Sequence, residues 1–134
     1  MKILFDTNVL IASFIARGVC HELFEYCVEH HSLVTSDFIL GEFREKLVSK
    51  FKYTDKDAND ATELLTSRME VITPTLLDEA VCRDADDDNI LAAAISAGCR
   101  CIITGDKDLL LLERYQEIDI LNPANFPKYE EDNQ

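Results

Sequence analysis

Short apolar runs alternate along the chain with longer segments whose apolar residues recur at helical spacing. Residues 2–5 form the first apolar run, and similar runs predict further strands at 33–35, 71–72, 100–104 and 118–121. Helical spacing and capping residues predict helices at 9–12, 20–31, 37–47, 55–69, 89–97 and 109–112. Because strands that alternate with helices favour parallel pairing, we expect a three-layer α/β/α sandwich around a mainly parallel sheet of about five strands.

The length of the chain suits one domain followed by a short tail. With 134 residues, the chain is expected to form a single domain over residues 1–127. Residues 75–82 are expected to add a helical turn, and residues 128–134 an irregular, polar, acidic tail. The apolar runs are shorter than the ~18 residues of a membrane span, and the first residues do not resemble a signal peptide. We therefore expect a cytoplasmic protein with no membrane partner.

The charge of the chain is strongly negative. Thirteen basic residues stand against 26 acidic ones, which gives a net charge of −13. Such a charge repels nucleic acid at long range and favours a basic partner. Arg44, Lys46 and Lys50 belong to one basic stretch that offsets this charge locally. The five cysteines include no C-x-x-C pair and the three histidines match no zinc spacing, so we expect reduced, structural cysteines and no zinc site.

Two carboxylates follow directly on predicted buried strands. Asp6 comes after residues 2–5, and Asp106 comes after the run that ends in Thr104-Gly105. Open α/β sheets bind ligands at the C-terminal ends of their strands. Asp6 alone is equally explained as the N-cap of the next helix, but the repeated strand-then-carboxylate design favours a shared site. Carboxylates that converge there repel one another unless a divalent cation lies between them, so we expect a metal site.

Further acids are expected to join this site from helices. Glu42 follows Gly41, a poor helix former whose position suggests close backbone approach, and Glu45 competes with Glu42 for the same role. Four aspartates precede the small-residue helix at 89–97, more than capping of a helix dipole requires. Among them Asp88 is the first candidate and Asp87 the second, whereas the remaining two, Asp84 and Asp86, are expected on the loop surface.

Several polar residues are candidates for supporting roles. Asn8, Ser36 and Thr104 could hold a carboxylate or a ligated water, and Asp108 could either add a contact or cap its helix. The sequence contains no G-x-S-x-G nucleophile motif, no Walker loop and no G-x-G-x-x-G. These absences leave the metal site as the main candidate for chemistry.

Four short motifs in a fixed order resemble those of the PIN-domain ribonucleases. The similarity is greatest to the bacterial and archaeal members that are toxins of toxin–antitoxin pairs, and it extends over nearly the whole chain to residues 120–126. The motifs are Asp6-Thr7-Asn8-Val9-Leu10, Ser36 with Ile39-Leu40-Gly41-Glu42, Asp87-Asp88-Asn89-Ile90-Leu91-Ala92, and Thr104-Gly105-Asp106-Lys107-Asp108-Leu109-Leu110. The resemblance implies an α/β/α sandwich with an acidic pocket, Mg²⁺ or Mn²⁺ as cofactor, and hydrolysis of RNA phosphodiester bonds.

The resemblance also implies roles for individual residues and partners. The matching acids are Asp6, Glu42, Asp88 and Asp106. Of these, Asp6, Asp88 and Asp106 are expected to bind the metal, and Glu42 to orient the attacking water or act as general base. The basic residues Arg44, Lys46 and Lys50 are expected to contact RNA phosphates. Expected partners are the RNA substrate, a basic antitoxin protein and a second copy of the chain.

Two other functions are compatible with parts of this sequence. A PIN-like binding protein with little catalysis could act through a basic partner, although four intact, mutually repelling carboxylates argue against it. A metal-dependent phosphatase or phosphotransferase would need an Asp-x-Asp pair after the first strand, and this chain has Asp6-Thr7-Asn8 there. A metal-dependent endoribonuclease, acting as a toxin, is the leading hypothesis.

Overall fold

A single mixed sheet of six strands forms the centre of the protein. The computed structural model describes residues 1–134. The strands are β1 (Lys2–Phe5), β2 (Ser32–Ser36), β3 (Glu70–Ile72), β4 (Cys101–Ile103), β5 (Arg114–Tyr115) and β6 (Ile118–Leu121). Their order across the sheet is β3-β2-β1-β4-β6-β5, and every pairing is parallel except that of β5 with β6. The predicted mainly parallel sheet is confirmed, with the two-residue β5 as an added edge strand.

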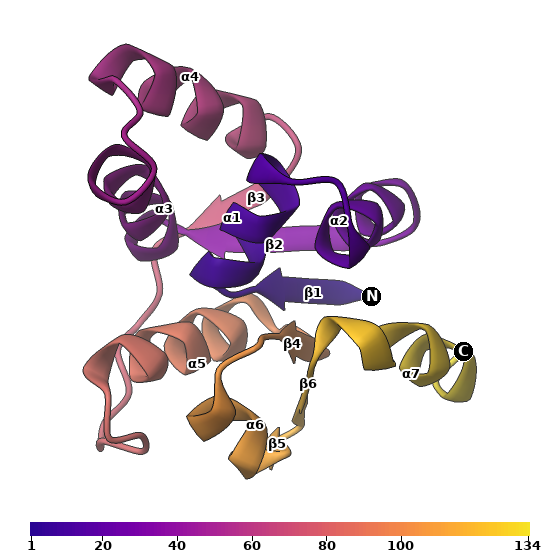
Figure 1. The fold of residues 1–134 in the computed structure, drawn as a ribbon. Helices are drawn as coiled ribbons and strands as arrows, with labels where there is room; N and C mark the ends of the chain where they lie inside the picture. Colours follow the sequence, from indigo (N-terminus) through magenta and orange to yellow (C-terminus); the bar gives the residue numbers. More distant parts are fainter.

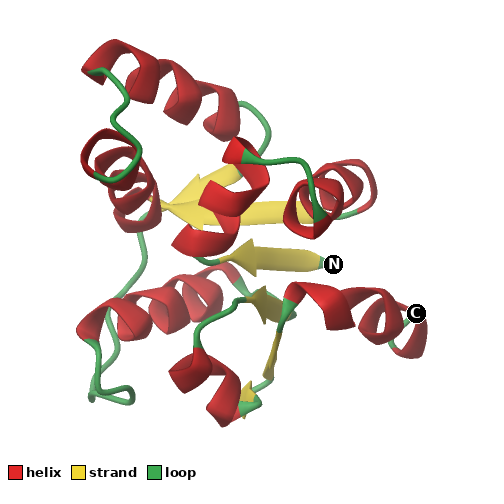
Figure 2. Cartoon of the chain, viewed as in Figure 1, coloured by secondary structure: helices red, strands yellow, loops and turns green.

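Helices flank this sheet (Figures 1 and 2). They are α1 (Thr7–Ile15), α2 (Val19–His30), α3 (Asp37–Ser49), α4 (Asp55–Thr66), α5 (Ala85–Ala97), α6 (Lys107–Leu112), the 3₁₀ helix η1 (Pro123–Asn125) and α7 (Phe126–Asp132). In Figure 1, α3 and α4 lie near β2 and β3, whereas α7 lies at the end of the sheet where β1 begins. The predicted α/β architecture is therefore confirmed. None of these helices has the length and apolar character needed to cross a membrane.

The two central strands supply the middle of the core. Ile3, Leu4 and Phe5 of β1 are fully buried, as are Ile102 and Ile103 of β4. Strands covered on both faces need apolar side chains on both faces, which explains why these segments are uninterrupted apolar runs. This burial fixes the strand ends, from which Asp6 and Asp106 follow.

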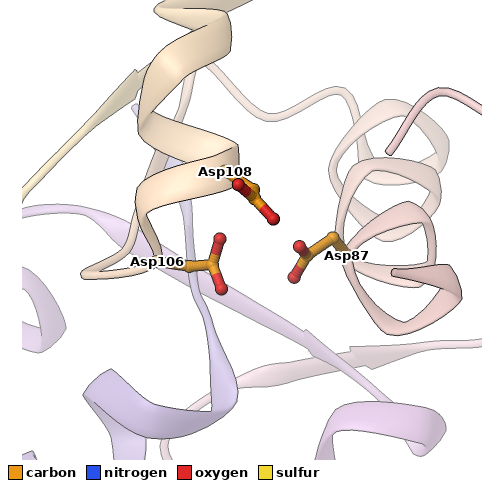
Figure 3. Close-up of side chains that lie close together, drawn as sticks. All are labelled: Asp87, Asp106 and Asp108. Atoms are coloured by element: carbon orange, nitrogen blue, oxygen red, sulfur yellow. The ribbon is translucent and has the colours of Figure 1, made fainter. Parts of the chain in front are cut away.

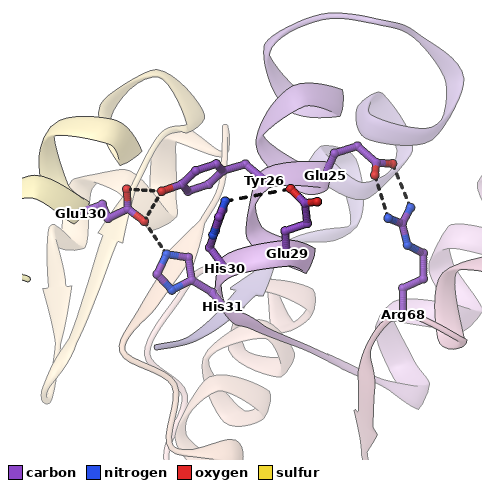
Figure 4. A network of polar contacts seen from close by, with 7 residues as sticks. All are labelled: Glu25, Tyr26, Glu29, His30, His31, Arg68 and Glu130. Carbon is purple, nitrogen blue, oxygen red and sulfur yellow. Dashed lines mark hydrogen bonds and ion pairs between the residues drawn. The ribbon is translucent and has the colours of Figure 1, made fainter.

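Residues after β6 are ordered, so the irregular tail expected at 128–134 is wrong. Asn122 caps η1 by accepting a hydrogen bond from the Asn125 N–H at 3.0 Å, and Phe126 is 1% exposed. From α7, the Tyr129 hydroxyl donates to Asp119 at 2.7 Å. Glu130 accepts hydrogen bonds from other parts of the chain (Figure 4). The capped turn and one buried aromatic ring stabilise a helix too short and polar to show apolar periodicity.

The segment between β3 and α5 is a loop, so the helical turn expected at 75–82 is also wrong. The carboxylate of Asp88 holds the end of this loop by accepting hydrogen bonds from two backbone N–H groups, those of Val81 at 3.1 Å and Cys82 at 2.8 Å.

All five cysteines are free thiols, and burial raises the pKa of Cys27 and Cys99 to about 12. These thiols stay protonated near neutral pH, as expected for cysteines that serve as small apolar residues.

Candidate functional site

Asp6 and Asp106 lie side by side at the C-terminal ends of the paired strands β1 and β4. Each carboxylate also caps the helix that follows, because Asp6 Oδ1 accepts the Val9 N–H at 2.9 Å and Asp106 Oδ1 accepts the Leu109 N–H at 3.0 Å. Thr104 joins them: its hydroxyl donates to Asp6 Oδ2 and accepts the Asp106 N–H at 3.0 Å. Capping and a site role are therefore compatible, and Thr104, which was expected to support a ligated water, hydrogen-bonds to Asp6 itself.

A polar cavity of about 110 Å³ opens beside these two carboxylates. Six carboxylates and one ammonium group line it, together with two other polar residues and one apolar one. The lining residues are Asp6, Thr7, Asn8, Glu42, Lys46, Asp84, Asp86, Asp87, Ile90 and Asp106. We call this cavity the acidic pocket. It brings together Asp6, Glu42 and Asp106, three of the four acids that the sequence singled out.

Asp87 also lines the pocket, whereas Asp88, the remaining acid that the sequence singled out, lies outside it. Asp87 is 8% exposed, and its Oδ2 atom is buried without a hydrogen-bond partner. Asp88 is instead engaged by the backbone of the preceding loop. Counting back from the buried Ile90 and Leu91 by three and four residues gives Asp87, so extending the apolar stripe of α5 by one turn would have identified it.

Two aspartates expected on the loop surface also line the pocket. Asp84 is the N-cap of α5, where its side chain accepts the Asp86 N–H at 2.9 Å. Asp86 lies near Glu42 and contributes to the raised pKa of that carboxyl group. Both residues are exposed, as expected of a surface position, and they also line the pocket. The N-cap and the first turn of α5 therefore form part of the pocket wall.

Asp108 lies next to the acidic pocket, at the start of α6. One carboxylate oxygen from each of Asp87, Asp106 and Asp108 lies within 4.8 Å of the others, and the three side chains point toward one another (Figure 3). Arg83 donates to both oxygens of Asp108, at 2.9 and 3.0 Å. Asp108 is therefore placed to add a contact to an ion held by the other two.

Glu42 enters the pocket from the first half of α3. Thr7, which begins α1, donates its hydroxyl hydrogen bond to Glu42 Oε1 at 2.8 Å. Glu45 is exposed and does not line the pocket, so of these two candidates only Glu42 lies in it. Nothing lies within 4 Å of where a Cβ on Gly41 would be, so the expected close backbone approach is absent. Ser36 lies outside the pocket and caps α3 by accepting the Ile39 N–H at 3.1 Å.

Burial raises the pKa values of three carboxyl groups in the pocket. Burial raises the pKa of Asp6, against the lowering effect of its hydrogen bonds, and burial also raises the pKa of Glu42. Burial, reinforced by the charge of Asp106, raises the pKa of Asp87 to about 6. The pocket thus concentrates negative charge that it does not neutralise itself. Hard oxygen ligands together with a buried, unpartnered carboxylate oxygen fit a divalent cation such as Mg²⁺ or Mn²⁺.

The basic stretch contributes one side chain to the pocket. Lys46 lies one turn after Glu42 and donates to Asn8 Oδ1 at 3.0 Å. Arg44 is engaged by Asn59 at 2.6 Å and Asp55 at 3.3 Å, both at the start of α4. The Lys50 ammonium lies outside the pocket, 5.8 Å from the centroid of the Phe51 ring. Of the three predicted RNA contacts, Lys46 alone borders the acidic pocket.

Comparisons with known proteins agree with this geometry. A PIN-domain family profile matches residues 2–108. An uncharacterized protein of Methanocaldococcus jannaschii, MJ1680, is 33% identical over 117 residues, which cover 84% of this chain and 75% of the relative.

Three solved structures share the fold at low sequence identity. VapBC2 from Rickettsia felis, bound to a DNA fragment from its promoter, has a TM-score of 0.67 at 14% identity, covering 91% of this chain and 98% of that one. VapBC-1 from nontypeable Haemophilus influenzae has a TM-score of 0.66 at 19% identity, covering 92% and 99%. VapC20 from Mycobacterium tuberculosis, described as a sarcin–ricin loop cleaving toxin, has a TM-score of 0.61 at 19% identity, covering 87% and 98%. The match over residues 2–108 and the acidic pocket at the ends of β1 and β4 show that the chain belongs to the PIN-domain family.

Proposed function

We propose that this protein is a metal-dependent endoribonuclease that hydrolyses RNA phosphodiester bonds in the acidic pocket and acts as the toxin of a toxin–antitoxin pair. The observation that carries the proposal is the Asp87 Oδ2 atom, which is buried without a partner among five other carboxylates. A buried, unpartnered carboxylate is costly unless a cation neutralises it. Membership of the PIN-domain family and the likeness in fold to an RNA-cleaving toxin support the same reaction.

In this proposal four acids of the pocket have a defined part. Asp6, Asp87 and Asp106 would hold Mg²⁺ or Mn²⁺, and Asp87 takes the place first assigned to Asp88. A bound divalent cation supplies an activated water and stabilises negative charge on the reacting phosphate. Thr104 fixes the orientation of Asp6 through its hydrogen bond.

Glu42 and Lys46 would act on the water and the substrate. Thr7 fixes one oxygen of Glu42, and the raised pKa of Glu42 brings it closer to the operating pH of a general base. Glu42 orients the attacking water and accepts its proton. Lys46, at the edge of the same pocket, contacts a phosphate of the RNA and offsets part of the negative charge that the substrate meets.

The proposed partners follow from charge and function. A net charge of −13 favours a basic protein, so an antitoxin that binds this chain is expected to be basic. We propose a cytoplasmic location, because that is where an RNA-cleaving toxin would meet its substrate. Association with a second copy stays a prediction, to be measured by light scattering.

Cleavage of a mixed-sequence single-stranded RNA tests the proposal. We expect cutting with Mn²⁺ or Mg²⁺, none with EDTA, and none by the Asp6→Asn or Asp87→Asn variants in any condition. Equal cutting by wild type and Asp6→Asn would reveal a contaminating nuclease. Wild-type protein that binds Mn²⁺ but cuts no RNA would favour the alternative, a catalytically weak PIN-like protein that acts through its partner.

A further inference from the structure

An apolar groove lies between α2 and the C-terminal segment, away from the acidic pocket. Its volume is about 600 Å³, and apolar side chains make up more than half of its lining residues. Leu23 and Phe126 form its floor, whereas Val19 is 61% exposed and Tyr26 is 38% exposed. We call it the α2–α7 groove. Exposed apolar side chains grouped in a concave surface are typical of a binding site for another protein.

The walls of this groove are held in place before any partner binds. Glu130 of α7 accepts hydrogen bonds from the Tyr26 hydroxyl at 2.7 and 2.8 Å, and it also contacts His31 (Figure 4). The His31 ring packs edge-on against Phe126, with ring centroids 5.7 Å apart. Because α2 and α7 are joined by these contacts, little ordering of the groove is needed on binding, which favours affinity.

Charge at the rim selects the kind of partner. Glu22 lies at the rim, is exposed, and forms no ion pair in the structure. A second copy of the chain would bring another surface of a −13 protein against it, which like-charge repulsion disfavours. A segment with apolar side chains for the floor and Lys or Arg for Glu22 satisfies both the shape and the charge.

The groove and the acidic pocket occupy opposite ends of β1. The pocket begins at Asp6, directly after β1, and the groove shares no lining residue with it. At the other end, the Met1 amino group donates to His31 Nδ1 at 3.1 Å, and His31 in turn contacts Glu130 of the groove wall. We propose that the α2–α7 groove binds a basic amphipathic segment of a partner protein while the acidic pocket stays open to its own ligands.

Selection of random short peptides by mRNA display against the immobilised full chain tests this proposal. We expect the selected peptides to combine large apolar residues with Lys or Arg. Their affinity is expected to fall by at least about tenfold in Val19→Gln and in Glu22→Lys. The first variant removes an apolar contact, and the second removes the charge that attracts Lys or Arg. A peptide in which Lys or Arg is replaced by Glu should recover affinity for Glu22→Lys.

Matched variants elsewhere on the surface serve as controls. Leu111→Gln changes an apolar side chain that is 79% exposed on α6, and Glu117→Lys makes the same charge change between β5 and β6. Both are expected to bind the selected peptides like wild type, and Mn²⁺ binding should be the same in all four variants. The proposal is overturned if no peptides are enriched, if the enriched peptides lack basic residues, or if the control variants weaken binding equally. Self-association that disappears in Val19→Gln would also overturn it, because the occupant would then be a second copy.

Discussion

Asp87 and Asp88 are consecutive residues of α5, yet their carboxylates have opposite surroundings. Asp87 points into the acidic pocket with one buried oxygen unpartnered, whereas Asp88 accepts hydrogen bonds from the backbone of Val81 and Cys82. Successive side chains on a helix point about 100° apart, so adjacent residues seldom face the same site. Asp87 therefore belongs to the site, whereas Asp88 holds the loop before α5.

Replacing each of these aspartates by asparagine should have different effects. Asp87→Asn is expected to abolish measurable Mn²⁺ binding, because it removes a buried negative charge from the pocket. Asp88→Asn should bind Mn²⁺ with wild-type affinity and lose about 1 kcal/mol of stability, as for a weakened helix cap. Isothermal titration with Mn²⁺ and thermal unfolding measure the two effects. Loss of Mn²⁺ binding in Asp88→Asn, with Asp87→Asn unaffected, would show that Asp88 and not Asp87 binds the metal.

The stability of the metal-free protein should depend on pH through Asp87. Its folded-state pKa of about 6 lies above the ordinary aspartate value, so protonation favours the folded state. This contribution is fully present below about pH 4 and is lost as the pH rises through about 6. In EDTA, wild type should therefore lose up to about 3 kcal/mol relative to Asp87→Asn across this window, measured by urea unfolding. Parallel pH profiles for the two proteins would contradict the raised pKa.

The hydroxyl of Thr104 should be needed to hold Asp6 ready for the metal. Thr104→Val removes the donor to Asp6 and the acceptor for the Asp106 N–H, at an expected stability loss of about 1–3 kcal/mol. The pKa of Asp6, already raised by burial, should rise further, so Mn²⁺ binding should require a higher pH. Thr104→Ser keeps the hydroxyl and should restore the wild-type pH profile of Mn²⁺ affinity. An unchanged profile in Thr104→Val would show that the hydroxyl does not tune Asp6.

Lys46 and Lys50 should differ in their effect on RNA. Lys46→Met is expected to weaken RNA binding and to lower the slope of log affinity against log salt by about 0.7, as for one lost phosphate contact on a single strand. Lys50→Met is the matched control, because Lys50 does not line the acidic pocket. Fluorescence anisotropy at several salt concentrations, with the Asp6→Asn background to prevent cleavage, measures both. Equal effects of the two variants would show that the RNA does not contact Lys46 at the edge of the pocket.

Glu130 should contribute to stability at neutral pH and lose that contribution in acid. Partial burial raises the pKa of Glu130, but hydrogen bonds from Tyr26 and His31 outweigh this effect and leave the pKa below its ordinary value. The stabilisation is therefore present above the ordinary glutamate pKa and is lost as the pH falls through the lowered one. Glu130→Ala should cost about 1–2 kcal/mol at pH 7 and close to nothing near pH 3, measured by urea unfolding. A constant difference across this range would exclude the ionised carboxylate as the cause.

The parts of the fold that could be predicted are those whose pattern reflects burial directly. The central strands β1 and β4 are apolar because both of their faces are covered, and Asp6 and Asp106 follow them in the chain, so both the strands and these two site residues were predictable. β5 was not, because a strand of two residues has no periodicity. The helix α7 was not predictable either, because it is stabilised by one buried ring and by contacts with residues distant in the sequence. The local sequence pattern does not contain these contacts.

Choosing Asp87 rather than Asp88 required the rotational phase of α5. Four aspartates at the start of α5 make every choice acidic, so residue type could not decide among Asp84, Asp86, Asp87 and Asp88. The phase could have been fixed from the apolar stripe that continues through Ile90 and Leu91. Asp84 and Asp86 also line the pocket, because the start of α5 lies close to Glu42 in the folded chain. This proximity joins residues that are far apart in the sequence, so a local pattern does not reveal it.

The hydrogen bond from Thr104 to Asp6 joins residues 98 positions apart. During synthesis Asp6 leaves the ribosome 98 residues before Thr104, and Asp106 follows Thr104. The pocket therefore cannot assemble on a half-made nascent chain. If the pocket cleaves RNA, a nascent chain cannot do so before Thr104 and Asp106 have left the ribosome.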